Sequence, residues 1–360
     1  MALRRTPLRL VLLLLVLGSW GLGELFGTHG IERATAYRYG TALLLGVGLF
    51  ASTAGIDRRE AAVHKRLIVG AVTAGVLVKA ALIGTVLYLA TRDPVFFVLA
   101  VAVAQIDPLS VASILGNDRM SPRAKTILAS WASFDDPVTV LLAVYLTAVL
   151  SGNEGTGAAF VTGAASYAVD LALNLALAGA AWLAWRTLRR QPVVLVIILA
   201  LLAGVAVWQF LMLGVAIAGL FVRPGWLPRV LVPATNTALL LAGALLGLLL
   251  VNGVDPWSGL ALGVLAFVAQ ILAAALLTRG LPRIDRTHLA FAQQNGITAI
   301  ILALRLEADF VGSVAVIAPA ILVTNIVHFG ANWLLDRASR RRESTARSPD
   351  RHRAPTPGPP

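Results

Sequence analysis

Residues 94–115 read PVFFVLAVAVAQIDPLSVASIL, an apolar run long enough to cross a bilayer that contains an aspartate and a proline near its middle. A helix needs about 20 apolar residues to span the hydrocarbon core. A carboxylate inside such a run is costly unless it is solvated, paired or protonated. Pro108 has no backbone N–H, so it leaves one carbonyl without its helical partner. The stretch therefore predicts a membrane span that is interrupted around Asp107 by a polar cavity.

The whole chain has the composition of a membrane protein. Of its 360 residues, 58% are hydrophobic and 13% are charged, whereas a soluble domain carries about 25% charged residues. We therefore predict an all-α polytopic protein whose main partner is the lipid bilayer. Apolar runs predict about twelve transmembrane helices, at residues 8–26, 39–55, 67–90, 94–115, 127–150, 158–185, 192–207, 210–222, 230–251, 257–277, 289–306 and 312–335.

Basic residues alternate between the loops and predict the orientation. They collect before residue 10, in 57–66, 119–125, 186–190, 223–229 and 279–286, and after 336, whereas the intervening loops have few. By the positive-inside rule this predicts a multi-pass protein of the plasma (inner) membrane with both termini cytoplasmic. We expect residues 1–336 to form the transmembrane domain and residues 337–360, rich in Arg, Ser and Pro, to form a disordered cytoplasmic tail.

Two segments allow a second interpretation. Residues 192–222 are long for one span and short for two, but basic loops on both sides favour two short helices turning near Trp208 and Gln209. One long tilted helix is the alternative.

Residues 8–17 resemble the apolar part of a signal peptide, yet the apolar run continues to Phe26 without a clear cleavage site. A retained first helix is therefore the preferred interpretation.

Three predicted spans carry polar groups at a similar depth. They are Asp107-Pro108 in the fourth span, Asp135-Asp136 in the fifth, and Gln293, Gln294, Asn295 and Gly296 in the eleventh. At ~1.5 Å per residue, Asp107, Asp136 and Asn295 lie ~12, ~14 and ~10 Å from the inner ends of their spans. The first and last of these spans run in opposite directions, which predicts inverted repeats with two discontinuous crossing helices. A plain kink at Pro108, a helix cap at the acidic pair, and interhelical hydrogen bonds of the amides are the structural alternatives.

Two further charges lie inside predicted spans. Lys79 in the third span is ~18 Å and Asp170 in the sixth is ~22 Å from the inner end. Their similar depth makes an intramembrane ion pair between them one prediction. A snorkelling lysine and a water-facing aspartate are the alternative.

Other functional classes lack their residues in this sequence. The net charge of +12 arises from loops and the tail, as topology requires, so we expect no nucleic-acid partner. With no cysteine and five histidines without ligand spacing, the sequence predicts no transition-metal site. It contains no nucleophile triad, zinc motif or phosphate loop, so we expect neither an enzyme nor a cofactor.

With these residues in hand, the chain resembles the monovalent cation:proton antiporters, the sodium/proton exchanger superfamily. Residues 106–109 (IDPL) resemble the Thr-Asp-Pro stretch of that family's first broken helix, and 133–136 (SFDD) resemble its acidic pair. Residues 296–299 (GITA) with 302–304 (LAL) are similar to its second broken helix. Residues 208–219 (WQFLMLGVAIAG) resemble its short-helix segment.

The resemblance implies a secondary transporter that exchanges protons for Na⁺, K⁺ or Li⁺, and a homodimer. It implies Asp136 as the main cation and proton ligand, with Asp135 and Asp107 as further binding groups. Pro108, Gln294, Asn295, Gly296 and Thr298 would support the broken helices.

Three departures from the family stand out. Trp131 stands where the family has Glu, Asn295 stands where it has Arg, and the tenth span has no Lys to partner Asp135. A cation channel or uniporter on the same scaffold is therefore a second hypothesis, and a non-transporting membrane sensor a third.

Overall fold

A computed structural model describes residues 6–56, 69–107, 120–151, 157–292 and 294–346. Within these residues the regular structure is helical, apart from one isolated β-bridge between Ile106 and Gln294. The helices are α1 (Thr6–Phe26), α2 (Thr35–Ala54), α5 (Val76–Thr91), α6 (Val95–Val103), α8 (Pro122–Ser151), α9 (Gly157–Leu188), α10 (Pro192–Gln209), α11 (Met212–Gly219), α12 (Leu227–Leu249), α13 (Pro256–Leu277), α14 (Arg283–Ala290), α15 (Ile297–Glu307) and α16 (Ser313–Ala346).

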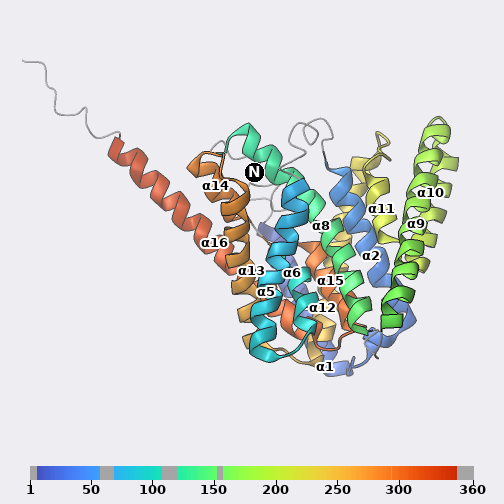
Figure 1. The fold of residues 1–360 in the computed structure, drawn as a ribbon, viewed down its shortest axis with the longest axis horizontal. Coiled ribbons are helices and arrows are strands. Elements are labelled where there is room, and N and C mark those ends of the chain that lie inside the picture. The colour runs from blue at the N-terminus through green and yellow to red at the C-terminus, as the bar shows by residue number, and fades with distance from the viewer. Residues whose placement is uncertain (1–5, 57–68, 108–119, 152–156, 293, 347–360) are drawn as a thin grey trace, which may run out of the picture.

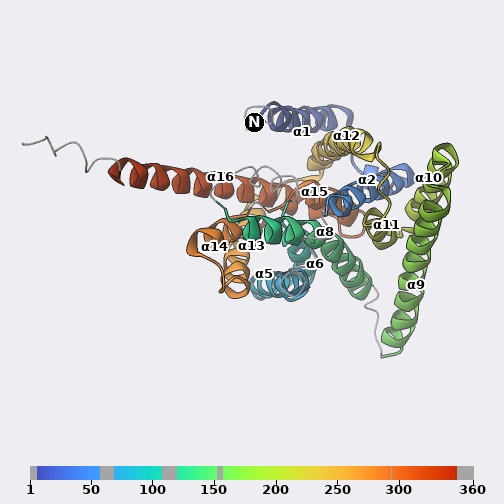
Figure 2. The same cartoon turned by 90° about the horizontal axis from the view of Figure 1, so that it is seen from above.

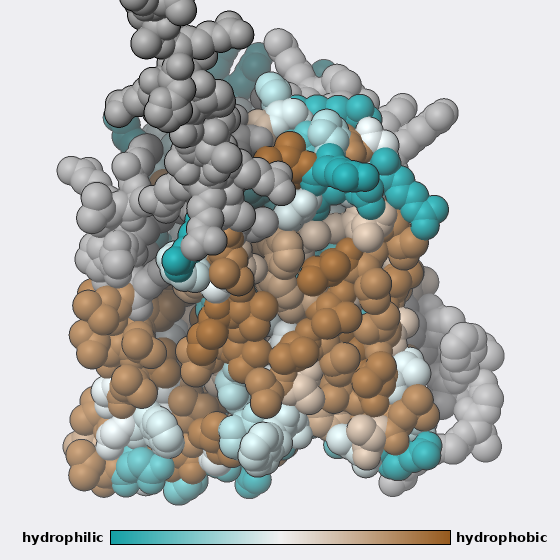
Figure 3. Space-filling view, turned by 90° about the vertical axis from the view of Figure 1, so that its left-hand side faces the viewer, coloured by the Kyte–Doolittle hydropathy of each residue, from teal (hydrophilic) through white to brown (hydrophobic). Residues whose placement is uncertain are grey.

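The surface of the molecule is that of a multi-pass membrane protein. Among the described residues, seven helices are long and apolar enough to cross a membrane. Figure 3 shows a broad hydrophobic belt across the middle of one face, with hydrophilic residues gathered at both ends. Such a belt matches the hydrocarbon core of a bilayer, because lipid tails are as apolar as the side chains that face them. The number of twelve spans stays a prediction.

The short helices α6 and α15 lie near the centre of the bundle, and longer helices surround them (Figures 1 and 2). In α6 each side chain from Val98 to Val103 is at most 3% exposed, and most of α15 is buried as well. By contrast, α9 and α10 pack against each other at the edge of the molecule. The elements that carry the predicted breaks therefore lie in the protein interior, where irregular backbone can be satisfied.

Close helix packing fixes α13 against α16. A Cβ atom on Gly259 or Gly263 would come within 2.8 Å of a carbonyl oxygen of α16, so glycine is needed at both positions. At its start, α13 is capped by Asp255, whose carboxylate accepts a hydrogen bond from the Ser258 N–H at 3.0 Å. Hydrogen bonds from Ser258 hold the pKa of Asp255 below its ordinary value.

The ambiguous segment 192–222 forms two helices, as the basic loops predicted. The first, α10, ends at Gln209, and Phe210 then adopts a left-handed conformation with φ 56°. The chain turns there, and α11 begins at Met212. The alternative of one long tilted helix is wrong.

The C-terminal tail needs a correction. We expected disorder from residue 337, but α16 continues as a helix to Ala346. Residues 347–360 lie outside the described part of the chain. Arg337 stacks its guanidinium over the Trp333 ring at 5.2 Å, a contact across one helical turn that favours continuing the helix.

Candidate functional site

The two interrupted segments meet in the middle of the protein. After α6 ends at Val103, Ile106 forms an antiparallel bridge with Gln294. The Asn295 N–H donates to the Gln105 carbonyl at 3.2 Å, and Asn295 has a left-handed φ of 62°. Backbone groups that no helix satisfies are thus paired across the crossing, as a membrane interior requires.

Asp136 lies beside this crossing and is bound by two hydroxyl groups. Ser52 of α2 donates to its Oδ2 at 3.0 Å, and Thr298 of α15 donates to the same oxygen at 2.9 Å. The Asp136 side chain is 2% exposed. No cation pairs with it among the described residues. The result is a buried carboxylate on α8 that accepts one hydroxyl hydrogen bond from α2 and one from α15.

Asp135, the neighbour of Asp136 on α8, is part of a different arrangement. Its Oδ2 is 3.1 Å from Lys79 Nζ of α5 and accepts the Ile106 N–H at 3.0 Å. Lys79 also donates to Gln270 of α13 at 3.2 Å and lies over the Trp131 ring at 5.5 Å. Both charged side chains are fully buried, and the Ile106 N–H and Gln270 support the pair with further hydrogen bonds, while Asp135 Oδ1 has no hydrogen-bond partner among the described residues.

This pair corrects two expectations. The predicted ion pair between Lys79 and Asp170 is wrong, because Lys79 pairs with Asp135. Asp135 was expected to lack a cationic partner because the tenth span has no lysine. The partner comes from the third predicted span instead, and the tenth contributes Gln270 as a second acceptor for the same ammonium group.

Asp107 occupies the N-terminal end of α15. Its carboxylate lies so close to Gly296 that a Cβ atom on that residue would overlap it. Gly296 is the residue before the first turn of α15. Helix N-termini present unpaired N–H groups and a partial positive charge, which stabilise a carboxylate. The helix end therefore compensates the negative charge of Asp107, a buried residue that is 6% exposed.

The three buried carboxylates thus differ in how their charge is balanced. Lys79 balances Asp135, and the start of α15 balances Asp107. Among the described residues, Asp136 has hydroxyl donors alone. A carboxylate in a low-dielectric interior without a cation takes up a proton or a cation. Of these three residues, Asp136 is the one whose surroundings favour uptake of a proton or a cation.

Of the five predicted supporting residues, Gln294, Asn295, Gly296 and Thr298 lie at the crossing, and Pro108 lies outside the described residues. Asn295 donates through Nδ2 to Thr324 Oγ1 at 3.1 Å. Its Oδ1, and both polar side-chain atoms of the fully buried Gln294, have no hydrogen-bond partner among the described residues. Such orphan groups indicate bound water or an ion, since buried polar atoms are nearly always paired. Gln293 lies outside the described residues as well.

Sequence reasoning missed Ser52 and the pair Gln105 and Thr139, whose side chains join at 3.2 Å. Each is a polar residue in an apolar span, and that signal was available. It was weak because a serine or threonine in a helix satisfies itself by bonding to its own backbone, as Thr53 does with Leu49.

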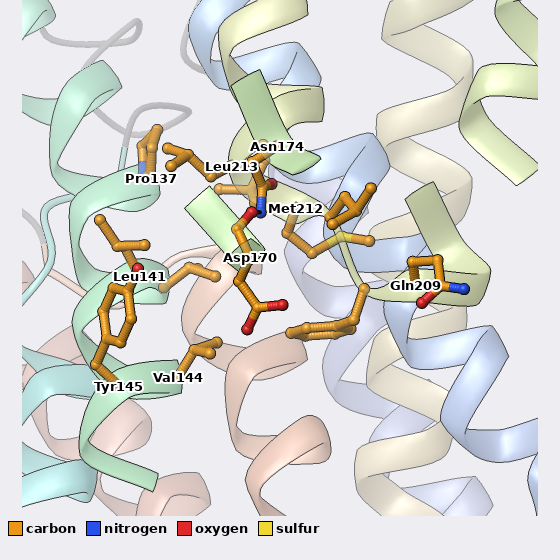
Figure 4. Close-up of a pocket in the computed structure, with 13 residues that line it drawn as sticks. Pro137, Leu141, Val144, Tyr145, Asp170, Asn174, Gln209, Met212 and Leu213 are labelled. Carbon is orange, nitrogen blue, oxygen red and sulfur yellow. Dashed lines mark hydrogen bonds between the residues drawn. The ribbon is translucent and has the colours of Figure 1, made fainter. Parts of the chain in front are cut away.

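A cavity opens beside the site, between α8, α9 and the turn from α10 to α11 (Figure 4). It offers about 110 Å³ to water-sized molecules and is lined by Pro137, the residue after Asp136. Asp170 projects into this cavity instead of pairing with Lys79.

We predict that Gly296→Ala impairs the site. The added methyl group overlaps the Asp107 carboxylate, and overpacking of this kind typically costs about 1–3 kcal/mol. We expect a lower melting temperature in detergent and a loss of any ion-dependent activity. Gly204→Ala in α10 is the control, because nothing lies within 4 Å of its Cβ position. Equal melting temperatures for the two variants would contradict the close approach of Asp107.

Comparisons with known proteins agree with this geometry. The family model described as sodium/hydrogen exchanger, transmembrane, matches residues 3–335. Among solved structures, that of the sodium proton antiporter MjNhaP1 from Methanocaldococcus jannaschii superposes with a TM-score of 0.63 at 15% sequence identity. The match covers 91% of this chain and 90% of that one. No curated protein matches the sequence. At this identity the structural likeness concerns the fold.

Proposed function

The chain belongs to the sodium/hydrogen exchanger family, and on that premise we propose that it exchanges protons for Na⁺, K⁺ or Li⁺ by competition at Asp136. The observation that carries the proposal is the contrast between Asp136 and the other buried carboxylates. Asp135 has Lys79 and Asp107 has the start of α15, whereas the side chain of Asp136 bonds, within the described part of the chain, to the Ser52 and Thr298 hydroxyls alone.

Competition follows from the chemistry of these groups. A protonated Asp136 is neutral and stable in an apolar interior. An ionised Asp136 attracts a hard cation, and the two hydroxyl groups rotate so that their lone pairs face the ion. Carboxylate and hydroxyl oxygens are ligands that such cations prefer. One carboxylate holds either the proton or the cation, so release of one accompanies binding of the other.

The neighbouring groups keep Asp136 in place and complete the ion's surroundings. Thr139 donates to the Asp136 carbonyl at 2.9 Å and to Gln105 at 3.2 Å, which joins α8 to the end of the first interrupted segment. The unpartnered oxygens of Gln294 and Asn295 are available to a water or to the ion as it passes the crossing. Asp107 and Asp135 act in this proposal as fixed charges that shape the field at Asp136.

The finer topology belongs to the same proposal. Residues 1–336 make up the transport domain in the plasma (inner) membrane, with both termini cytoplasmic, because basic loops alternate with basic-poor loops. Two inverted repeats cross at the bridge between Ile106 and Gln294 and rock around it. The assembly is the homodimer that the resemblance implies.

The channel hypothesis rested on a missing ion pair. Since Lys79 supplies a partner for Asp135, that argument no longer favours a channel or uniporter over an exchanger. A sensor without transport has no observation in its favour.

The test is transport by the purified full-length chain in proteoliposomes. We expect addition of Na⁺, K⁺ or Li⁺ on one side to drive protons in the opposite direction, against a proton gradient, for at least one cation. A comparison across pH and the three cations identifies the ion. Proton movement no greater than in protein-free vesicles, or electrical currents far above carrier turnover, would overturn the proposal in favour of its rivals.

A further inference from the structure

The cavity beside the site follows one face of α8. Pro137, Val140, Leu141, Val144 and Tyr145 line it, and their spacing places them on a single side of the helix. The first of them directly follows Asp136. Since α8 starts next to the basic loop at 119–125, Tyr145 lies toward the opposite membrane face. The cavity thus extends from the residue next to Asp136 toward the face whose loops carry few basic residues.

The opposite wall comes from α9, α10 and α11. It carries Asp170, Asn174 and Gln209 together with apolar side chains of residues 210–213. Both polar atoms of the Asn174 side chain take part in hydrogen bonds within the protein. Its Oδ1 accepts the Gly214 N–H at 2.7 Å, and its Nδ2 donates to the Asp170 backbone carbonyl at 2.8 Å. These two bonds fix α9 against α11 and thereby hold the Asp170 backbone at the cavity wall.

Asp170 is the one charged side chain among the described residues that line the cavity. Figure 4 shows its carboxylate pointing into the space between Leu141, Val144 and Tyr145 on one side and Met212 on the other. No hydrogen bond or ion pair joins that carboxylate to another described residue. Asp170 is an exposed residue in this partly open cavity, and a single negative charge beside apolar walls raises the local concentration of cations.

We propose that Asp170 captures the transported cation in this cavity and passes it on to Asp136. The ligand class is a partly hydrated monovalent cation, since one carboxylate with the Tyr145 and Gln209 side chains leaves room for water in about 110 Å³. This proposal rests on the exchange function above and adds an entry site on one side of the membrane. It also gives Asp170 a role in transport, since Asp170 does not form the predicted ion pair with Lys79.

The test compares Asp170→Asn with the unaltered protein while the cation is added on either side of the vesicle membrane. We expect the half-saturating cation concentration to rise about tenfold on the cavity side and to stay unchanged on the side of the basic loops. The maximal rate should not change. The difference should shrink at high ionic strength, because salt screens a capture charge. Glu24→Gln serves as the matched control, since Glu24 is an exposed carboxylate outside the cavity that bonds to Trp20.

A second measurement separates this proposal from the exchange function. In Asp136→Asn protein, ²³Na⁺ line broadening should retain one weak binding component, which the double variant with Asp170→Asn should lose. Loss of that component supports cation binding at Asp170 even if the unaltered protein shows no exchange. An unchanged component in the double variant, or equal half-saturation shifts on both sides of the membrane, would overturn the capture role.

Discussion

Asp136→Asn is expected to abolish cation-driven proton movement and leave only the rate of protein-free vesicles. Asparagine has nearly the shape of aspartate and keeps a carbonyl oxygen that accepts from Ser52 and Thr298. It cannot bind a proton at physiological pH or neutralise a cation. The variant therefore removes the exchanging charge and preserves the packing, and fluorescence of an internal pH dye measures the result in proteoliposomes.

The control for this variant is Asp93→Asn. Asp93 is an exposed carboxylate that caps the start of α6 through the Val95 N–H at 2.9 Å, and asparagine caps equally well. It should transport like the unaltered protein. If Asp136→Asn protein melts at the normal temperature and still moves protons in response to a cation, Asp136 is not the exchanging group.

Lys79→Met is expected to cause the largest loss of stability among single substitutions at the site. It leaves the Asp135 carboxylate fully buried without its cation. Removing one partner of a buried ion pair typically costs about 3–5 kcal/mol. Methionine roughly matches the lysine stem in volume, so the loss reports on charge more than on packing. Thermal unfolding in detergent, followed through tryptophan fluorescence, measures it.

The double variant Lys79→Met with Asp135→Asn completes the cycle. Asparagine removes the unpaired charge and still accepts from the Ile106 N–H. We therefore expect it to recover most of the melting temperature that Lys79→Met loses, because the two sites are directly coupled. Lys125→Met, near the start of α8, is the control for loss of a lysine as such. Additive effects of the two substitutions would show that the pair does not contribute as its geometry implies.

The depth of the site could be predicted from the sequence because a helix rises by a fixed amount per residue. Asp107, Asp136 and Asn295 were assigned a common level in this way, and the structure brings their segments together at the crossing. The turn at Phe210 was equally predictable, since the basic loops on both sides of residues 192–222 require the chain to return to the same face.

Which charged residues form an ion pair could not be predicted from their depth in the membrane. Lys79 and Asp170 had similar depths and were paired on that basis, but Lys79 joins Asp135. Depth is one coordinate, whereas contact also requires the right face of each helix and the right neighbour in the membrane plane. No short-range pattern reports which helices are neighbours, so the lysine on α5 and Gln270 on α13 were not connected with the acidic pair on α8.

The sequence by itself therefore determined the class of protein, the interrupted span around Asp107, and the acidic pair that carries the candidate chemistry. These features depend on composition and on local helix geometry, which do not change with the helices that pack around a segment. The tertiary structure decided which carboxylate is left without a compensating charge. Lys79 reaches Asp135, the start of α15 reaches Asp107, and hydroxyl groups from α2 and α15 reach Asp136. Charge balance in a low-dielectric interior is a property of neighbours in space, and those neighbours come from helices that are far apart in the chain.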